Sequence, residues 1–206
     1  WTSKYPALLS SQALKNIGVV LAGNIPLVGF HDMLWVLMSG NNFSGKLSSK
    51  DEVLLRAMVD VLCEIEPEFN NKITFSEENL KSVDAIIATG SNNTSRYFEY
   101  YFGKYPHIIR KNRNSLAILS GNETNEELEK LADDIFLYYG LGCRNVAKIF
   151  VPESYNFNIL LDALEKYRFV IDNSKYANNY NYYKSIYLMN NEPFYNNGFL
   201  LLKQDN

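Results

Sequence analysis

The sequence predicts an α/β fold with a largely parallel sheet. Apolar runs of strand length alternate along the chain with amphipathic segments of helical length, a pattern typical of βαβ units. The 206 residues are enough for one large or two small globular domains, and 47% hydrophobic with 21% charged residues is ordinary for a folded protein. The chain is therefore expected to bury a sizeable core.

The first part of the chain alternates predicted strands and helices. Residues 17–22 (IGVVLA) predict a buried strand, and residues 43–47 predict a short one. Pro26 favours the first turn of a helix, because its missing N–H costs nothing there. This helix is predicted to run to about Ser39, and Gly40 to end it.

Two capping-box patterns predict later helices. Residues 49–52 (SKDE) precede a helix with one apolar face, and residues 124–127 (TNEE) precede another, which Gly140 is expected to end. The apolar face of that second helix consists of Leu128, Leu131, Ala132, Ile135, Phe136 and Tyr139. Further strands are predicted over residues 72–75, 84–89 and 146–151, with a short helix between the first two.

Composition suggests where the chain divides. Residues 104–114 are basic and polar, and we interpret them as the seam between two lobes, residues 1–110 and residues 111–206. Residues 173–197 are dense in Asn and Tyr, which we interpret as compositional drift in an exposed region.

Charge and composition exclude several function classes. A net charge of -3 gives no general reason to bind nucleic acid or an anionic membrane. Every apolar run meets a charge or polar cluster too early to predict a membrane span, and no signal peptide is recognised. Two cysteines without metal-ligand spacing predict no metal site and favour a reducing cytoplasm. Because the sequence begins at Trp1, we expect a piece of a longer protein.

Cys143 is the first candidate for chemistry. It follows Gly140-Leu141-Gly142, just past the second capped helix and before a strand, and Arg144 beside it could favour the thiolate. A loop cysteine in this setting can act as a nucleophile, or it can be a small hydrophobe in a tight turn. Cys63 lies within a helical apolar pattern and is interpreted as core packing.

Polar residues follow three of the predicted strands. Asn24 comes after the first, where its amide could bind an oxyanion or cap a helix. Lys46 lies at the end of the second and Ser48 just after it, where they could hold ribose hydroxyls or a phosphate, or lie in solvent. Gly90 and Ser91 repeat this situation, although no GxGxxG fingerprint is present.

The histidines and carboxylates give weaker signals. His31 invites a catalytic role but fits a hydrogen-bonded core or surface histidine better, and the case for His107 is weaker still. The carboxylates are scattered, and no pair has an obvious shared site.

Taken together, these segments resemble the aldehyde dehydrogenase superfamily, and within it the acyl-CoA reductases of the bacterial luminescence fatty-acid reductase type. The similarity covers most of residues 17–152. The phrases that carry it are GNIPL, KLSSKD, ATGSNNTSRYFEYYF and GCRNVAKIFVP.

The resemblance implies two doubly wound three-layer lobes, the first binding a dinucleotide and the second carrying the nucleophile. Cys143 falls on the nucleophile and Asn24 on the oxyanion-hole Asn. Lys46, with Ser48 beside it, falls on the contact to the adenosine ribose. Gly90 and Ser91 match the Gly-Ser stretch near the pyrophosphate and nicotinamide. Glu192-Pro193-Phe194 loosely resembles the Glu-x-Phe segment at the nicotinamide ribose.

The implied function is NADPH-dependent reduction of fatty acyl-CoA to aldehyde through a cysteine thioester. Residues 107–111 lack the Glu general base of hydrolytic relatives, which argues against water attacking the thioester. The alternatives are a CoA-acylating aldehyde dehydrogenase that runs toward acyl-CoA, or a catalytically idle nucleotide-binding subunit or fragment. A homo-oligomer or an acyl-transferring partner subunit fits any of these.

Overall fold

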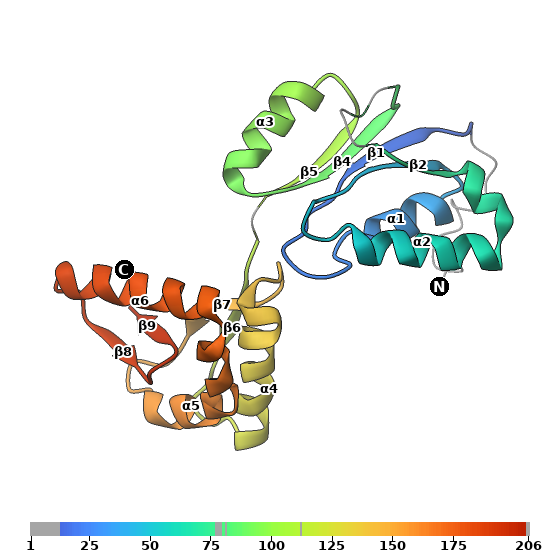
Figure 1. Cartoon of the computed structure of the whole chain (residues 1–206). Coiled ribbons are helices and arrows are strands. Elements are labelled where there is room, and N and C mark those ends of the chain that lie inside the picture. The colour runs from blue at the N-terminus through green and yellow to red at the C-terminus, as the bar shows by residue number, and fades with distance from the viewer. Residues whose placement is uncertain (1–12, 77–79, 81, 112, 205–206) are drawn as a thin grey trace. The chain divides into compact units, whose positions relative to one another are not determined.

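The structure is a computed structural model that describes residues 13–76, 80, 82–111 and 113–204 (Figure 1). The chain divides into two compact units, Trp1–Asn112 and Arg113–Asn206. Each unit has its own buried apolar clusters, and each is described by itself.

The first unit is built on a five-stranded parallel sheet. The strands lie in the order β3-β2-β1-β4-β5, and every neighbouring pair is parallel. Their bounds are β1 (Asn16–Val20), β2 (Asn42–Lys46), β3 (Ile73–Phe75), β4 (Ala85–Thr89) and β5 (His107–Arg110). Because the chain winds outward from β1 in one direction and later returns to place β4 on its other side, the crevice between β1 and β4 is a topological switch point.

Helices cover both faces of this sheet (Figure 1). Helices α1 (Phe30–Met38) and α2 (Val53–Ile65) pack with Val19 on one face, and α3 (Asn92–Phe102) packs on the face that includes Val20. Successive side chains of a strand point to opposite faces, and the apolar runs predicted at β1 and β4 are confirmed as strands that pack on both faces. Strand β2 is less apolar, and only Phe43 and Gly45 of it are buried. A 3-10 helix, η3 (Pro67–Asn71), joins α2 to β3.

Two helix starts in this unit differ from the predictions. Helix α1 begins at Phe30 rather than at Pro26, because Leu27 has a left-handed backbone conformation (φ 56°) that no α-helix can contain. The capping box predicted at residues 49–52 does not form. Instead the Glu52 carboxylate accepts hydrogen bonds from Arg56, at 2.7 and 2.9 Å, and α2 begins at Val53. The predicted short helix between residues 75 and 84 lies largely outside the described residues.

The second unit pairs two parallel strands with a layer of helices. Ala117, Val146 and Ile149 face a single apolar cluster that the helices complete, while Leu116 and Ile118 on the opposite face are exposed. The α/β class with parallel sheets is confirmed, and the described part of this unit supplies two layers. Its elements are β6 (Ser115–Ile118), α4 (Asn125–Phe136), η4 (Leu137–Gly140), β7 (Val146–Phe150), α5 (Phe157–Leu164), η5 (Glu165–Asp172), α6 (Ser174–Met189), β8 (Phe194–Asn196) and β9 (Leu201–Lys203).

The capping box at the start of α4 is confirmed. The Thr124 hydroxyl accepts the Glu127 N–H at 3.3 Å, and the Glu127 carboxylate accepts the Thr124 N–H at 2.8 Å. The predicted apolar face is buried or half-buried as far as Phe136, where α4 ends. Tyr139 does not continue that face, because Tyr138 and Tyr139 are left-handed, with φ of 54° and 59°.

Most residues of the Asn- and Tyr-rich segment are exposed, as expected, but the segment is folded and packs in part against the core. It forms α6 and β8, and Tyr180 is only 9% exposed. The hydroxyl of Tyr180 donates to Asn196 Oδ1 at 2.7 Å, and that of Tyr176 donates to the Phe199 carbonyl at 3.0 Å. A tyrosine can be buried where its hydroxyl finds a partner, so long-range pairing outweighs the polar composition of this segment.

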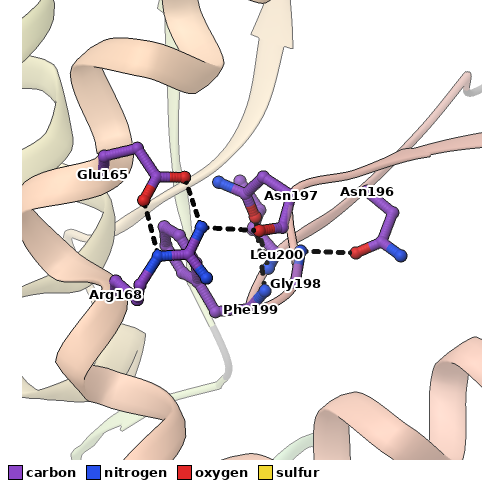
Figure 2. Close-up of polar contacts among 7 residues, drawn as sticks. All are labelled: Glu165, Arg168, Asn196, Asn197, Gly198, Phe199 and Leu200. Atoms are coloured by element: carbon purple, nitrogen blue, oxygen red, sulfur yellow. Dashed lines mark hydrogen bonds and ion pairs between the residues drawn. The ribbon is translucent and has the colours of Figure 1, made fainter.

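The turn between β8 and β9 is fixed by polar contacts that Figure 2 shows. The Arg168 guanidinium pairs with Glu165 at 2.7 and 2.8 Å and donates to the Asn197 carbonyl at 3.2 Å. Asn197 Oδ1 then accepts the N–H groups of the two residues that follow Gly198. Gly198 has φ 97°, a conformation open to glycine at little cost.

Tyr176 provides a test of this packing. Burial raises its pKa from the ordinary tyrosine value of 10.0 to about 12, so the unfolded chain loses this proton first. The stabilisation is complete below about pH 10 and is lost as the pH rises toward 12. We expect Tyr176→Phe to lower the free energy of unfolding by about 1 kcal/mol at pH 7 and to lose less stability than wild type between pH 10 and 12.

Denaturant unfolding at a series of pH values measures both effects. Tyr182→Phe, at a position 61% exposed, is the control and should follow wild type. A Tyr176→Phe variant that loses as much stability as wild type across this window would contradict the assignment.

Candidate functional site

The loop that carries Cys143 lies at the amino ends of the parallel strands of the second unit. Cys143 is exposed, and it stands between η4 and β7. The loop is tied to β6 as well, because the Ser115 N–H donates to the Asn145 carbonyl at 3.0 Å. The thiol is therefore presented to solvent from an anchored backbone.

Asn145 holds this loop against the end of α4. Its side-chain amide donates to the carbonyls of Asp134, Ile135 and Leu137 at 2.8, 3.3 and 3.2 Å. Its Oδ1 accepts the Gly142 N–H at 2.7 Å. One side chain thus satisfies carbonyls that the end of the helix leaves without partners and fixes the residue before the thiol.

Glycine is required at position 142 by this arrangement. A Cβ atom there would lie 2.6 Å from Asn145 Oδ1, which is closer than real Cβ contacts allow. The structure thus shows that Gly142 makes room for the amide that orders the loop. Cys63, by contrast, packs against the core of the first unit, as predicted.

Asn24 lies in the loop after β1, at the carboxyl edge of the first sheet, and its side chain is exposed. The alternative that Asn24 caps α1 is wrong, because the N-cap position is Gly29. The loop is held from the neighbouring β2–α2 loop, where Asp51 Oδ2 accepts the Leu27 N–H at 2.7 Å. This bond stabilises the left-handed Leu27 and fixes the course of the chain after Asn24.

Lys46 and Ser48 lie at the same edge. Lys46 ends β2 in register with Val20, and its carbonyl accepts the Leu21 N–H at 3.1 Å. Ser48 lies against the Asn24 loop so closely that a Cβ at Gly23 would fall within 2.3 Å of the Ser48 hydroxyl oxygen. Both residues are half-buried, and within the described residues Lys46 makes no ion pair.

Gly90 and Ser91 connect β4 to α3. Ser91 is the N-cap of α3, and its hydroxyl accepts the Thr94 N–H at 3.2 Å. A Cβ at Gly90 would lie 2.9 Å from the Phe98 ring, so glycine lets the helix pack tightly on the strand. The N-terminus of α3 therefore meets the carboxyl edge beside the switch point, where backbone N–H groups favour an anion.

The first unit thus brings together five of the predicted site residues, Asn24, Lys46, Ser48, Gly90 and Ser91, because the strands before them are parallel and end at one edge. Such an edge is where open α/β sheets bind nucleotides. A cationic side chain, a hydroxyl and a close-packed helix N-terminus at the edge of this sheet fit a nicotinamide nucleotide. Cys143 and Glu192 belong to the second unit.

Glu192 has a partner within its own unit. It follows α6, its N–H donates to the Tyr187 carbonyl at 2.9 Å, and its carboxylate forms an ion pair with Lys203.

Sequence reasoning missed an ion pair at the edge of the first sheet. Arg110, the last residue of β5, binds both carboxylate oxygens of Asp32 in α1 at 2.6 Å. The two residues are 78 positions apart, and no local pattern connects them. His31, which sequence reasoning did single out, is a surface residue whose Nε2 accepts the Trp35 indole N–H at 2.9 Å.

The described parts of the chain contain no group of His, Cys, Asp or Glu residues that could hold a metal ion. Nor does any helix there combine the length and apolar character needed to cross a membrane.

The sequence matches the family "Acyl-CoA reductase (LuxC)" over residues 9–167, which is more than half of the chain. The chain belongs to this family. A comparison with curated protein sequences found no match.

This chain shares its fold with solved structures of aldehyde dehydrogenases. A C269A mutant of propionaldehyde dehydrogenase from the Clostridium phytofermentans fucose utilisation microcompartment superimposes with a TM-score of 0.61 at 12% identity, over 73% of this chain and 38% of that one. The Mycobacterium tuberculosis aldehyde dehydrogenase complexed with NAD+ gives 0.60 at 18% identity, over 73% and 34%. Glyceraldehyde-3-phosphate dehydrogenase GapN from Methanocaldococcus jannaschii, complexed with NADP, gives 0.59 at 18% identity, over 73% and 36%. This acyl-CoA reductase chain thus spans little more than a third of those proteins.

Asn145→Ala tests how the Cys143 loop is held. We expect the free energy of unfolding to fall by about 2–3 kcal/mol, because three carbonyls and one N–H lose their partner. We also expect iodoacetamide to alkylate Cys143 before Cys63 in the wild type. The rate of alkylation of Cys143 should differ between the variant and the wild type.

The control is Asn122→Ala, which removes a side chain without a hydrogen bond in the described structure. Denaturant unfolding and peptide mass spectrometry measure the two effects. Equal stability of the two variants would show that Asn145 does not anchor the loop.

Proposed function

We propose that this protein reduces fatty acyl-CoA to aldehyde, with the acyl group carried as a thioester on Cys143 and NADPH as the reductant. The observation that carries the proposal is an exposed, glycine-flanked cysteine in an anchored loop of an acyl-CoA reductase family member. Membership of that family supports the substrate class and the choice of NADPH. Two free cysteines within the described residues suit a reducing cytoplasm, which we propose as the location.

The acyl transfer step needs only groups of this chain. The Cys143 thiolate attacks the acyl carbonyl, a new C–S bond forms, and the carbonyl oxygen becomes an oxyanion. The Asn24 amide and a backbone N–H near Cys143 donate to that oxyanion. When it collapses, the bond to the CoA sulfur breaks, and CoA leaves as a thiolate that takes a proton from solvent.

The carboxyl edge of the first sheet is the proposed cofactor site. Lys46 and Ser48 would hold the adenosine ribose, and Gly90 and Ser91 would place the N-terminus of α3 against the phosphates. When bound, the reduced nicotinamide supplies the hydride that converts the thioester to aldehyde. Glu192, whose carboxylate pairs with Lys203, is the proposed contact to the nicotinamide ribose, on its resemblance to the Glu-x-Phe segment.

The residues at the end of β5 support exchange of the Cys143 acyl group with a thiol rather than with water. Residues 107–111 supply no carboxylate that could activate a water molecule, and Arg110 itself is held by Asp32. An acyl group that arrives from CoA, or from an acyl-transferring partner subunit or a second copy of the chain, needs no such base.

Asn24→Ala tests the oxyanion role. We expect a fall of about 100- to 1000-fold in acyl-CoA-dependent NADPH oxidation, with the far-UV circular dichroism of wild type, because a transition-state hydrogen bond is lost. Cys143→Ala should abolish turnover. The control is Asn71→Ala, which replaces an exposed asparagine at the end of η3.

Activity of Asn24→Ala within twofold of wild type would remove Asn24 from the mechanism, and an active Cys143→Ala would remove the thioester. Faster turnover of aldehyde, CoA and NADP+ to acyl-CoA than of acyl-CoA and NADPH to aldehyde, at matched concentrations, would establish the acylating alternative. A wild-type chain that binds nucleotide without turnover would be the idle module instead.

A further inference from the structure

The ion pair between Asp32 and Arg110 is the feature of the first unit that the mechanism does not use. Arg110 Nη1 lies 2.6 Å from each Asp32 carboxylate oxygen. The Asp32 residue is only 8% exposed and the Arg110 side chain 31%. A carboxylate buried to this degree is stable only where it is paired, so the contact is built into the fold.

Arg110 links three elements at the carboxyl edge. It ends β5, its carbonyl accepts the Gly90 N–H of the β4–α3 loop at 3.1 Å, and its guanidinium reaches α1. Strand β4 lies between β5 and β1, and α1 follows β1. Arg110 therefore joins the two sides of the switch-point crevice, the β4–α3 side through its main-chain carbonyl and the β1–α1 side through its guanidinium.

The β1–α1 side is held on its other flank as well. Asp51 accepts the Leu27 N–H, three residues past Asn24, while Asp32 is anchored by Arg110. The loop that carries Asn24 therefore runs between two fixed points. The Asp32–Arg110 contact is the side-chain link between α1 and the strand that bonds the Gly90–Ser91 loop, while Met33, Val36 and Leu37 hold α1 in the core.

We propose that Asp32 and Arg110 form a positioning pair that sets the spacing between the Asn24 loop and the Gly90–Ser91 loop, and so orients the nicotinamide nucleotide. The spacing of the loops is inferred from the ion pair, and its effect on the nucleotide rests on the proposed function. Neither residue touches the reacting atoms. An arginine suits the role because its planar guanidinium can bind a carboxylate and stays charged, which a lysine matches poorly.

The test uses the full chain with four variants and a neighbouring control. Asp32→Asn and Arg110→Met break the pair, Arg110→Lys keeps the charge, and a double charge swap, Asp32→Arg with Arg110→Asp, restores it in reverse. The control is Glu99→Gln, which breaks the adjacent pair of Glu99 and Lys111 (2.9 Å), where both side chains are about half exposed.

Three readouts are measured on each variant. NADPH fluorescence titration gives the cofactor Kd, steady-state kinetics separates the KM for acyl-CoA from kcat, and amide hydrogen exchange follows residues 23–33 and 88–95. We expect Asp32→Asn and Arg110→Met to weaken NADPH binding by about 10- to 100-fold, because misplaced loops orient the ligand poorly. The KM for acyl-CoA should change little, exchange in both segments should quicken, and the swap should recover part of the loss. Arg110→Lys should be intermediate and Glu99→Gln like wild type.

Two results would overturn the inference. Weaker binding in Arg110→Met with unchanged or tighter binding in Asp32→Asn would show that Arg110 contacts the anionic cofactor directly. Exchange in both variants at the rate of Glu99→Gln would show that the pair positions nothing. If wild type binds no NADPH while exchange still quickens in both variants, the pair is confirmed as the link between the loops and the proposed function fails instead.

Discussion

The direction of the strands is the constraint on which the first unit depends. Because β1 to β5 are all parallel, the residues that follow β1, β2 and β4 must meet at one edge of the sheet. That edge receives the helix N-termini, which favour anions, and the loops that approach one another closely enough to require Gly23 and Gly90. The topology of the sheet thus brings functional side chains that are far apart in the sequence to one edge.

The second unit presents one sulfur atom, that of Cys143, on a fixed backbone. Four hydrogen bonds from Asn145 and the bond from Ser115 hold the Cys143 loop between the end of α4 and the start of β6. The thiol needs a nearby oxyanion donor and a hydride source, which in our proposal come from the first unit.

Local sequence patterns predicted the parts of the structure that short-range interactions determine. The buried strands are apolar runs, and the box at Thr124 and Glu127 forms because both partners lie within one turn. The same pattern at residues 49–52 fails because Arg56 competes for the Glu52 carboxylate. The start of α1 and the order of the Tyr-rich segment depend on partners at a distance, Asp51 for Leu27 and Phe199 for Tyr176. Among the site residues, the sequence could nominate Cys143 and Asn24 by their loops, but Arg110 and Asp32 become partners only in three dimensions.

The central claim is that an acyl group resides on Cys143 during turnover. The most direct measurement is peptide mass spectrometry after brief exposure of the full chain to acyl-CoA without reductant. We expect one acyl group per chain, located on the peptide with Cys143, absent from the peptide with Cys63 and removed by hydroxylamine. An unmodified Cys143 in a preparation that still forms free CoA and aldehyde when NADPH is added would contradict the account.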